Sequence, residues 1–122
     1  MGLFSFKSKT DPSSFNWVKL TEKNQLNDLI RESYVTPVLF FKHSIRCSIS
    51  SMAKNRLENN WNMENVVPVY LDLINFRNLS NQLAEEFGVV HASPQVILVK
   101  DGKCIFTASH NAIDVESIEN NI

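Results

Sequence analysis

The chain lacks several features that would mark it as a specialised class of protein. Its 122 residues include only two cysteines and three glycines, and two cysteines cannot form the disulfide framework of a small secreted domain. There is no excess of charge of one sign, since 12 basic residues are matched by 13 acidic ones and the formal net charge is -1. The basic residues are also spread along the chain. Because nucleic-acid-binding domains concentrate positive charge, we expect no nucleic-acid partner.

Long hydrophobic runs are absent as well. No apolar run approaches the roughly 20 residues that a membrane-spanning helix requires. The residues Met1 to Lys7 are briefly apolar, but they lack the basic start and the longer apolar stretch of a secretory signal. Phe6 occupies the place where a myristoylation signal has Ser or Thr. We therefore expect a cytoplasmic protein with no membrane partner, in a compartment that keeps both thiols reduced.

The composition that is present is that of an ordinary globular domain. Hydrophobic residues make up 43% of the chain and charged residues 20%, which is typical of proteins with a packed core. The length suits a single domain. Residues 1–14 show no sustained period and are predicted to form a flexible N-terminal arm, so that the domain covers residues 15–122.

Hydrophobic periodicity predicts strands that alternate with helices. Pro68 suggests that the strand containing it lies at an edge or is irregular, and Asp101-Gly102 is the dipeptide most typical of a tight hairpin. The order predicts an α/β fold: a mixed central sheet with a closing antiparallel hairpin and helices on both faces. The predicted strands are 17–20, 38–41, 66–73, 95–99 and 104–108. Four helices are predicted from helical spacing: one after Thr21 as its N-cap, one after Cys47, one over 79–87 and one over 115–122.

Cys47 opens the second predicted helix and is the main candidate for chemistry. Thiolates are the nucleophiles of disulfide exchange. The unpaired N–H groups and the positive dipole end of a helix N-terminus favour the thiolate. Lys42, His43 and Arg46, in the predicted connection before the helix, add positive or protonatable groups. The alternative is that Cys47 is simply a small buried apolar residue.

The segment Cys47-Ser48-Ile49-Ser50 has the spacing of a Cys-x-x-Cys redox pair with Ser in place of the second cysteine. A mixed disulfide on Cys47 would then have to be released by an outside thiol. Ser50 either donates a hydrogen bond to the thiolate or is only a polar residue in a first helical turn. Cys104 begins the returning strand of the hairpin, roughly 15 to 20 Å from Pro94, and is predicted to be structural.

Taken together, these features resemble a known fold family. A strand ending in Phe40-Phe41, a helix opened by Cys47, a proline before a strand at Pro94 and an Asp101-Gly102 hairpin follow one another along the chain. This order resembles the thioredoxin superfamily over nearly the whole predicted domain. In that superfamily the proline facing the active cysteine is cis and helps to form the substrate groove. The resemblance implies this role for Pro94, with Ser93 before it.

A narrower resemblance rests on three segments. Phe41 to Ser50, Ser93-Pro94-Gln95 and Ser109-His110 are together similar to the monothiol bacilliredoxin family. These proteins are linked to bacillithiol, a low-molecular-weight thiol that carries glucosamine and malate. The resemblance implies that Cys47 attacks a protein–bacillithiol mixed disulfide, takes the bacillithiol and frees the client protein, after which a further thiol regenerates Cys47.

The same resemblance supplies the expected site. No tightly bound cofactor or metal is expected, because two cysteines and three scattered histidines give no ligand spacing, and bacillithiol is a co-substrate. The malate carboxylates of bacillithiol would pair with basic side chains. Ser48 stands where family members commonly have Pro. His91 is predicted to be structural. The expected catalytic residues are Cys47 and Ser50, and the expected substrate-binding residues are Lys42, His43, Arg46, Ser48, Ser93, Pro94 and His110.

Two other functions remain open from the sequence. One is a redox-inactive thioredoxin-fold binding module, in which Ser48 and Ser50 mark lost redox activity and the groove beside Pro94 holds a partner segment. The other is a monothiol-glutaredoxin-like carrier that shares an iron–sulfur cluster across a dimer. The chain lacks the Cys-Gly-Phe-Ser segment typical of such carriers.

Overall fold

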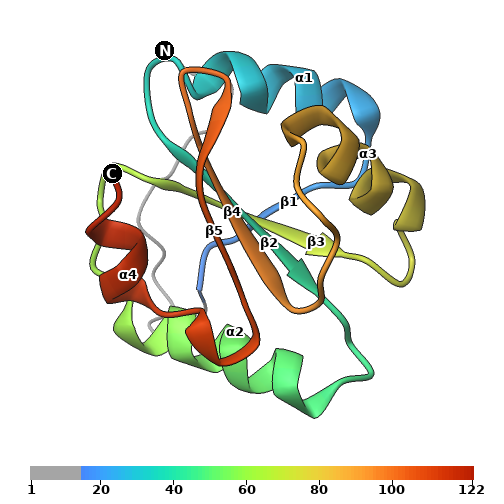
Figure 1. Cartoon of the computed structure of the whole chain (residues 1–122), viewed down its shortest axis with the longest axis vertical. Coiled ribbons are helices and arrows are strands. Elements are labelled where there is room, and N and C mark those ends of the chain that lie inside the picture. Colours follow the sequence, from blue (N-terminus) through green and yellow to red (C-terminus); the bar gives the residue numbers. More distant parts are fainter. Residues whose placement is uncertain (1–14) are drawn as a thin grey trace.

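A computed structural model describes residues 15–122 of the chain (Figure 1). The predicted N-terminal arm, residues 1–14, lies outside the described residues. In the described part, a five-stranded sheet has the strand order β1-β3-β2-β4-β5. The strands are β1 (Val18–Lys19), β2 (Val38–His43), β3 (Val67–Asp72), β4 (Gln95–Lys100) and β5 (Lys103–Ser109), and the helices are α1 (Lys23–Glu32), α2 (Ser48–Asn60), α3 (Arg77–Phe87), the 3-10 turn η1 (His110–Ala112) and α4 (Val115–Glu119).

The sheet is mixed, as the alternation of elements predicts. β3 runs parallel to both β1 and β2, whereas β4 is antiparallel to β2 and to β5. Figure 1 shows α1 and α3 together on one side of the sheet and α2 with α4 on the other. The predicted fold class, an α/β sheet with a closing hairpin and helices on both faces, is confirmed.

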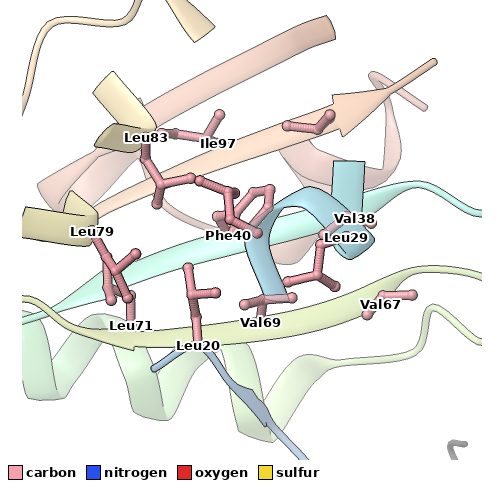
Figure 2. Packing of buried hydrophobic residues seen from close by; sticks show 12 residues of the cluster. Leu20, Leu29, Val38, Phe40, Val67, Val69, Leu71, Leu79, Leu83 and Ile97 are labelled. Atoms are coloured by element: carbon pink, nitrogen blue, oxygen red, sulfur yellow. The ribbon is translucent and has the colours of Figure 1, made fainter. Parts of the chain in front are cut away.

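The central strand β2 separates two hydrophobic clusters, because successive side chains of a strand point to opposite faces. Phe40 belongs to the cluster under α1 and α3, where Figure 2 shows it beside Leu83 and Ile97. Phe41 belongs to the cluster under α2 and α4, which includes Leu57. All six residues of β2 are buried, so the end of this strand is a well-packed support for the turn and helix that follow it.

Two predicted strand features are wrong. β2 ends at His43 rather than at Phe41, because Lys42 and His43 continue the ladder opposite Leu71 and Asp72 of β3. Pro68 lies in a strand between β1 and β2, not at an edge.

Pro68 is tolerated because its nitrogen faces a gap in the pairing. The N–H of Val67 donates to the Pro37 carbonyl on the β2 side, and the Tyr70 carbonyl accepts from the Leu20 N–H on the β1 side. Alternate residues of a strand direct their backbone groups to opposite neighbours. The Pro68 nitrogen therefore faces the β1 side, where pairing begins only at Val69.

The predicted turn and helix ends are mostly confirmed. Asp101 and Gly102 both have positive φ, 54° and 76°, as a primed two-residue hairpin turn requires. Gly88 ends α3 in the left-handed conformation. The N-cap of α1 is Glu22 rather than Thr21. The last helix, α4, ends at Glu119, so Ile122 lies beyond it and is exposed rather than packed on its apolar face.

Candidate active site around Cys47

Cys47 is the N-cap residue of α2, where the sequence predicts it. Its backbone is extended, with φ -118° and ψ 121°, and its carbonyl accepts the first helical hydrogen bond from the Ser51 N–H at 3.1 Å. Its own N–H donates to the Ser44 carbonyl at 3.2 Å, which closes the turn between β2 and α2. The thiol is partly exposed. A sulfur thus sits at the positive end of a 13-residue helix with access to solvent.

The chain segment around Cys47 exposes several apolar side chains and a cation. Ile45, Ile49 and Met52 are 51%, 47% and 58% exposed. Arg46 and Ser48, the two chain neighbours of Cys47, are also exposed. Apolar side chains and a guanidinium group are therefore exposed close to Cys47 in the chain.

Ser50 lies on the inner side of the first helical turn and is fully buried. Its hydroxyl oxygen accepts a hydrogen bond from the Ser44 N–H at 3.0 Å and lies 2.7 Å from Nδ1 of His43. The His43 ring packs near Phe41 and Tyr70, with ring centroids 5.7 and 5.5 Å apart. Ser50 is therefore bonded to the end of β2, and any hydrogen bond from it to Cys47 stays a prediction.

His43 is held in a setting that favours the neutral ring. Burial lowers its pKa from the usual 6.5, and the positive charge of Lys54 adds to this. The carboxylates of Asp72 and Glu58 act in the opposite direction with smaller effect. The balance leaves an uncharged imidazole at neutral pH, with Nδ1 directed at the Ser50 hydroxyl.

Lys42 points to the opposite face of the sheet. Its side chain is fully buried, and Nζ donates to Nδ1 of His91 at 3.2 Å. Ser80 of α3 lies 3.5 Å from the same nitrogen. Burial, together with the positive charge of Arg77, lowers the pKa of Lys42 to about 8. Burial also lowers the pKa of His91, which suits its role as a neutral acceptor.

The three basic residues expected to bind carboxylates are thus not gathered on one surface. Lys42 and His43 are strand residues that face opposite sides of the sheet, where the sequence predicts an exposed connection. Only Arg46 is exposed beside Cys47. The two strand residues each have a hydrogen-bond partner outside β2: Ser50, seven residues further on, for His43, and His91, 49 residues further on, for Lys42. Continuing the two-residue alternation of the strand past Phe41 was the signal that would have separated them.

The segment containing Pro94 lies at the same end of the sheet. The Ser93–Pro94 peptide bond is cis, and the next residue, Gln95, pairs with Lys42 of β2 and with Ser109 of β5. The Pro94 carbonyl accepts from the His110 N–H at 3.2 Å. The structure therefore brings together the predicted residues Ser93, Pro94 and His110.

Arg56 of α2 completes this arrangement and was not predicted from the sequence. Its guanidinium donates to the carbonyls of His110 and Ile113, at 2.9 and 3.1 Å. The His110 side chain is exposed. Arg56 thus ties the helix that begins at Cys47 to the turn beside Pro94, and a lone arginine in a polar helix face carries no sequence signal for such a role.

Cys104 occupies a different setting. It pairs with Val99 on the edge strand β5 and packs against the cluster under α1 and α3. Burial raises the pKa of its thiol. Ser109 lies five positions further along β5, about 17 Å of extended chain from Cys104. Both cysteines are free, and an open groove of about 640 Å³ is lined by Cys104, His91 and Gln95 among others.

The fold and the single thiol at the start of α2 define a thioredoxin-fold protein. Solved structures agree with this class. A thioredoxin-fold protein proposed to be an oxidoreductase matches with a TM-score of 0.76 and 28% identity, over 85% of this chain and 91% of that one. Mitochondrial thioredoxin 3 of Saccharomyces cerevisiae matches with a TM-score of 0.69 and 20% identity, over 87% and 92%. A Trypanosoma brucei brucei thioredoxin matches with a TM-score of 0.71 and 12% identity, over 94% of this chain and 93% of that one.

The particular family follows from the sequence match. Residues 18–118 match the family model of the monothiol bacilliredoxin BrxC, and the chain belongs to this family. Family and fold together give the protein a thiol redox role. None of the helices between residues 15 and 122 is long and apolar enough to cross a lipid bilayer.

Proposed function

We propose that the protein is a monothiol thiol–disulfide oxidoreductase that removes bacillithiol from protein mixed disulfides through Cys47. The observation that carries the proposal is the placement of Cys47: a partly exposed thiol at the N-cap of α2, in a chain of the bacilliredoxin family. Ser50, three residues later, supplies no second thiol. The chemistry must therefore pass through a mixed disulfide on Cys47 that an external thiol resolves.

The reaction consists of two thiol–disulfide exchanges. In the first, the Cys47 thiolate attacks the bacillithiol sulfur of a client mixed disulfide, so that a bond forms between Cys47 and bacillithiol and the client leaves as a thiolate. In the second, the thiolate of a low-molecular-weight thiol attacks the bacillithiol sulfur and releases Cys47. Each exchange breaks one S–S bond and forms another, and the net result is a reduced client and one small-molecule disulfide.

The surface around the thiol suits this substrate in two ways. Arg46 is exposed next to Cys47, and a guanidinium pairs well with the malate carboxylates of bacillithiol. The apolar side chains of Ile45, Ile49 and Met52 offer contact to the client protein. Ser48, Ser93, Pro94 and His110 are proposed to line the remainder of the substrate site, in a cytoplasmic setting that returns both thiols to the reduced state.

Intact-mass analysis of the protein mixed with a bacillithiol-modified client tests the proposal. We expect wild-type protein to gain one bacillithiol as the client loses one, and the Cys104→Ser variant to behave in the same way. The Cys47→Ser variant should gain no bacillithiol and should leave the client modified. Transfer that survives in Cys47→Ser, or wild-type protein that gains no adduct while the client keeps its own, would show that the function is a different one.

A further inference from the structure

The buried contact between His43 and Ser50 joins the end of β2 to the first turn of α2. The number of hydrogen bonds that the Ser50 hydroxyl can donate and accept limits how this contact can be made. Ser50 has one proton to donate and two lone pairs to accept with. One lone pair is taken by the Ser44 N–H at 3.0 Å. The contact with His43 Nδ1, at 2.7 Å, must use either the Ser50 proton or its second lone pair.

The position of the imidazole proton decides between the two arrangements. If Nδ1 carries no proton, Ser50 must donate to it and has nothing left for another acceptor. If Nδ1 carries the proton, the ring donates to Ser50, and the Ser50 O–H is free to point elsewhere. Both are arrangements of a neutral ring, so burial of His43 does not disfavour either.

Cys47 is the acceptor to which the freed hydroxyl would turn. Cys47 is the N-cap of α2 and Ser50 is the third residue of that helix, two positions from which each side chain can reach the other residue's backbone N–H in a capping box. The same spacing brings two sulfurs into bonding distance in Cys-x-x-Cys motifs. A thiolate accepts hydrogen bonds much better than a disulfide sulfur does, because it carries the full negative charge.

We propose that His43 is a positioning residue that, through Ser50, switches a hydrogen bond to Cys47 on in the thiolate and off in the mixed disulfide. This rests on the proposed role of Cys47. When the thiol ionises, its proton passes to solvent, the ring proton moves from Nε2 to Nδ1 by exchange with water, and Ser50 donates to the sulfur. When Cys47 enters a disulfide, Ser50 returns to Nδ1 and the ring proton to Nε2. One proton is released in the first step and none is lost in the second.

The groups that face His43 are compatible with this switch. Lys54 and Glu58 of α2 form an ion pair at 2.7 Å, and Asp72 of β3 lies opposite His43 in the strand register. Tyr70 packs on the ring, and burial raises the pKa of its phenol, which keeps it neutral. The charges near His43 are thus of both signs.

The switch has a direct spectroscopic test in the Cys104→Ser background, with methyl methanethiosulfonate as the probe that caps Cys47. Nitrogen chemical shifts of His43 report which ring nitrogen carries the proton. We expect the proton on Nδ1 in the thiolate form and on Nε2 in the capped form. The same tautomer in both forms would overturn the proposal. Because the probe is not bacillithiol, the result is independent of the small-thiol substrate.

Kinetics of Cys47 alkylation by iodoacetamide provide a second test. Ser50→Ala should slow alkylation at neutral pH roughly tenfold, since a hydrogen bond to a charged group is lost, while Ser51→Ala, at an exposed neighbouring position, should not. His43→Phe keeps an aromatic ring between Phe41 and Tyr70 but removes the acceptor that competes for the Ser50 proton, so alkylation should be at least as fast as in the wild type.

The combination of variants separates positioning from simple packing. If His43 acts only through the Ser50 hydroxyl, the double variant with His43→Phe and Ser50→Ala should alkylate as slowly as Ser50→Ala alone. Slow alkylation in the single variant His43→Phe, which retains the hydroxyl, would contradict the proposal and indicate a packing role for the ring.

Discussion

The two faces of the sheet each carry one cysteine and one buried basic residue from the end of β2, yet these groups touch different things. On the α2 face, His43 bonds to Ser50 in the first turn of the helix that Cys47 opens. On the α1 and α3 face, Lys42 bonds to His91, and Cys104 sits within a strand against apolar side chains. The comparison teaches that the element carrying a thiol decides its surroundings: a helix end offers N–H groups and solvent, and a strand offers packing.

The largest contrast expected between the faces is the reactivity of the two thiols. At pH 7, iodoacetamide should modify Cys47 much faster than Cys104, because only thiolates react and a raised pKa lowers the thiolate fraction of Cys104. Burial raises the pKa of Cys104, so its labelling should appear only at alkaline pH. Peptide mapping after timed alkylation measures both rates. Equal rates at pH 7 would erase the distinction between the faces.

The buried lysine should make stability depend on pH. The pKa of Lys42 is lowered to about 8 from 10.5, so above pH 8 the folded protein has released a proton that the unfolded chain still holds. Stability therefore rises with pH in this window. Relative to Lys42→Met, the free energy of unfolding of the wild type should rise by about 2 kcal/mol between pH 8 and 9.5, at about 1.4 kcal/mol per pH unit.

Urea unfolding at several pH values measures this difference. Lys100→Met, at an exposed position of β4, is the matched control and should parallel the wild type at every pH. A constant difference between wild type and Lys42→Met from pH 7 to 9.5 would mean that Lys42 keeps an ordinary pKa and that its burial costs little.

The buried polar residues at the end of β2 also mark the limit of prediction from sequence. The strand–helix order, the helix start at Cys47 and the Asp101-Gly102 turn follow from local patterns that depend on near neighbours. The continuation of β2 through Lys42 and His43 does not, because the burial of these polar residues depends on hydrogen-bond partners, His91 and Ser50, that only the folded structure shows. A polar residue after an apolar run is read as the start of a loop unless such a partner is known.

Placing a second thiol on the α2 face should change the fate of the mixed disulfide. Ser50→Cys restores the Cys-x-x-Cys spacing, so the introduced thiol can attack the adduct on Cys47 and expel the small thiol. We expect the adduct lifetime, followed by intact mass, to fall roughly tenfold or more, because intramolecular attack has a high effective concentration. Ser51→Cys adds the same group at an exposed position and should leave the lifetime unchanged. An unchanged lifetime in Ser50→Cys would count against the geometry assigned to this turn.

The smallest effect expected concerns His91, which accepts the hydrogen bond from Lys42 on the other face. Burial, with the charges of Lys42 and Arg77, lowers the pKa of His91, so below pH 6.5 the unfolded chain takes up a proton that the folded protein resists. Stability is thus lost as the pH falls below 6.5. His91→Asn keeps an acceptor for Lys42 but does not titrate. Between pH 7 and 5 the free energy of unfolding of the wild type should fall by under about 1 kcal/mol relative to this variant, since His91 is exposed and water screens its charge.

His91→Leu removes the acceptor and should be less stable than His91→Asn already at pH 7, by about 1 kcal/mol. Equal stability of these two variants at pH 7 would show that Lys42 finds another acceptor, and the two faces would then differ only in their thiols.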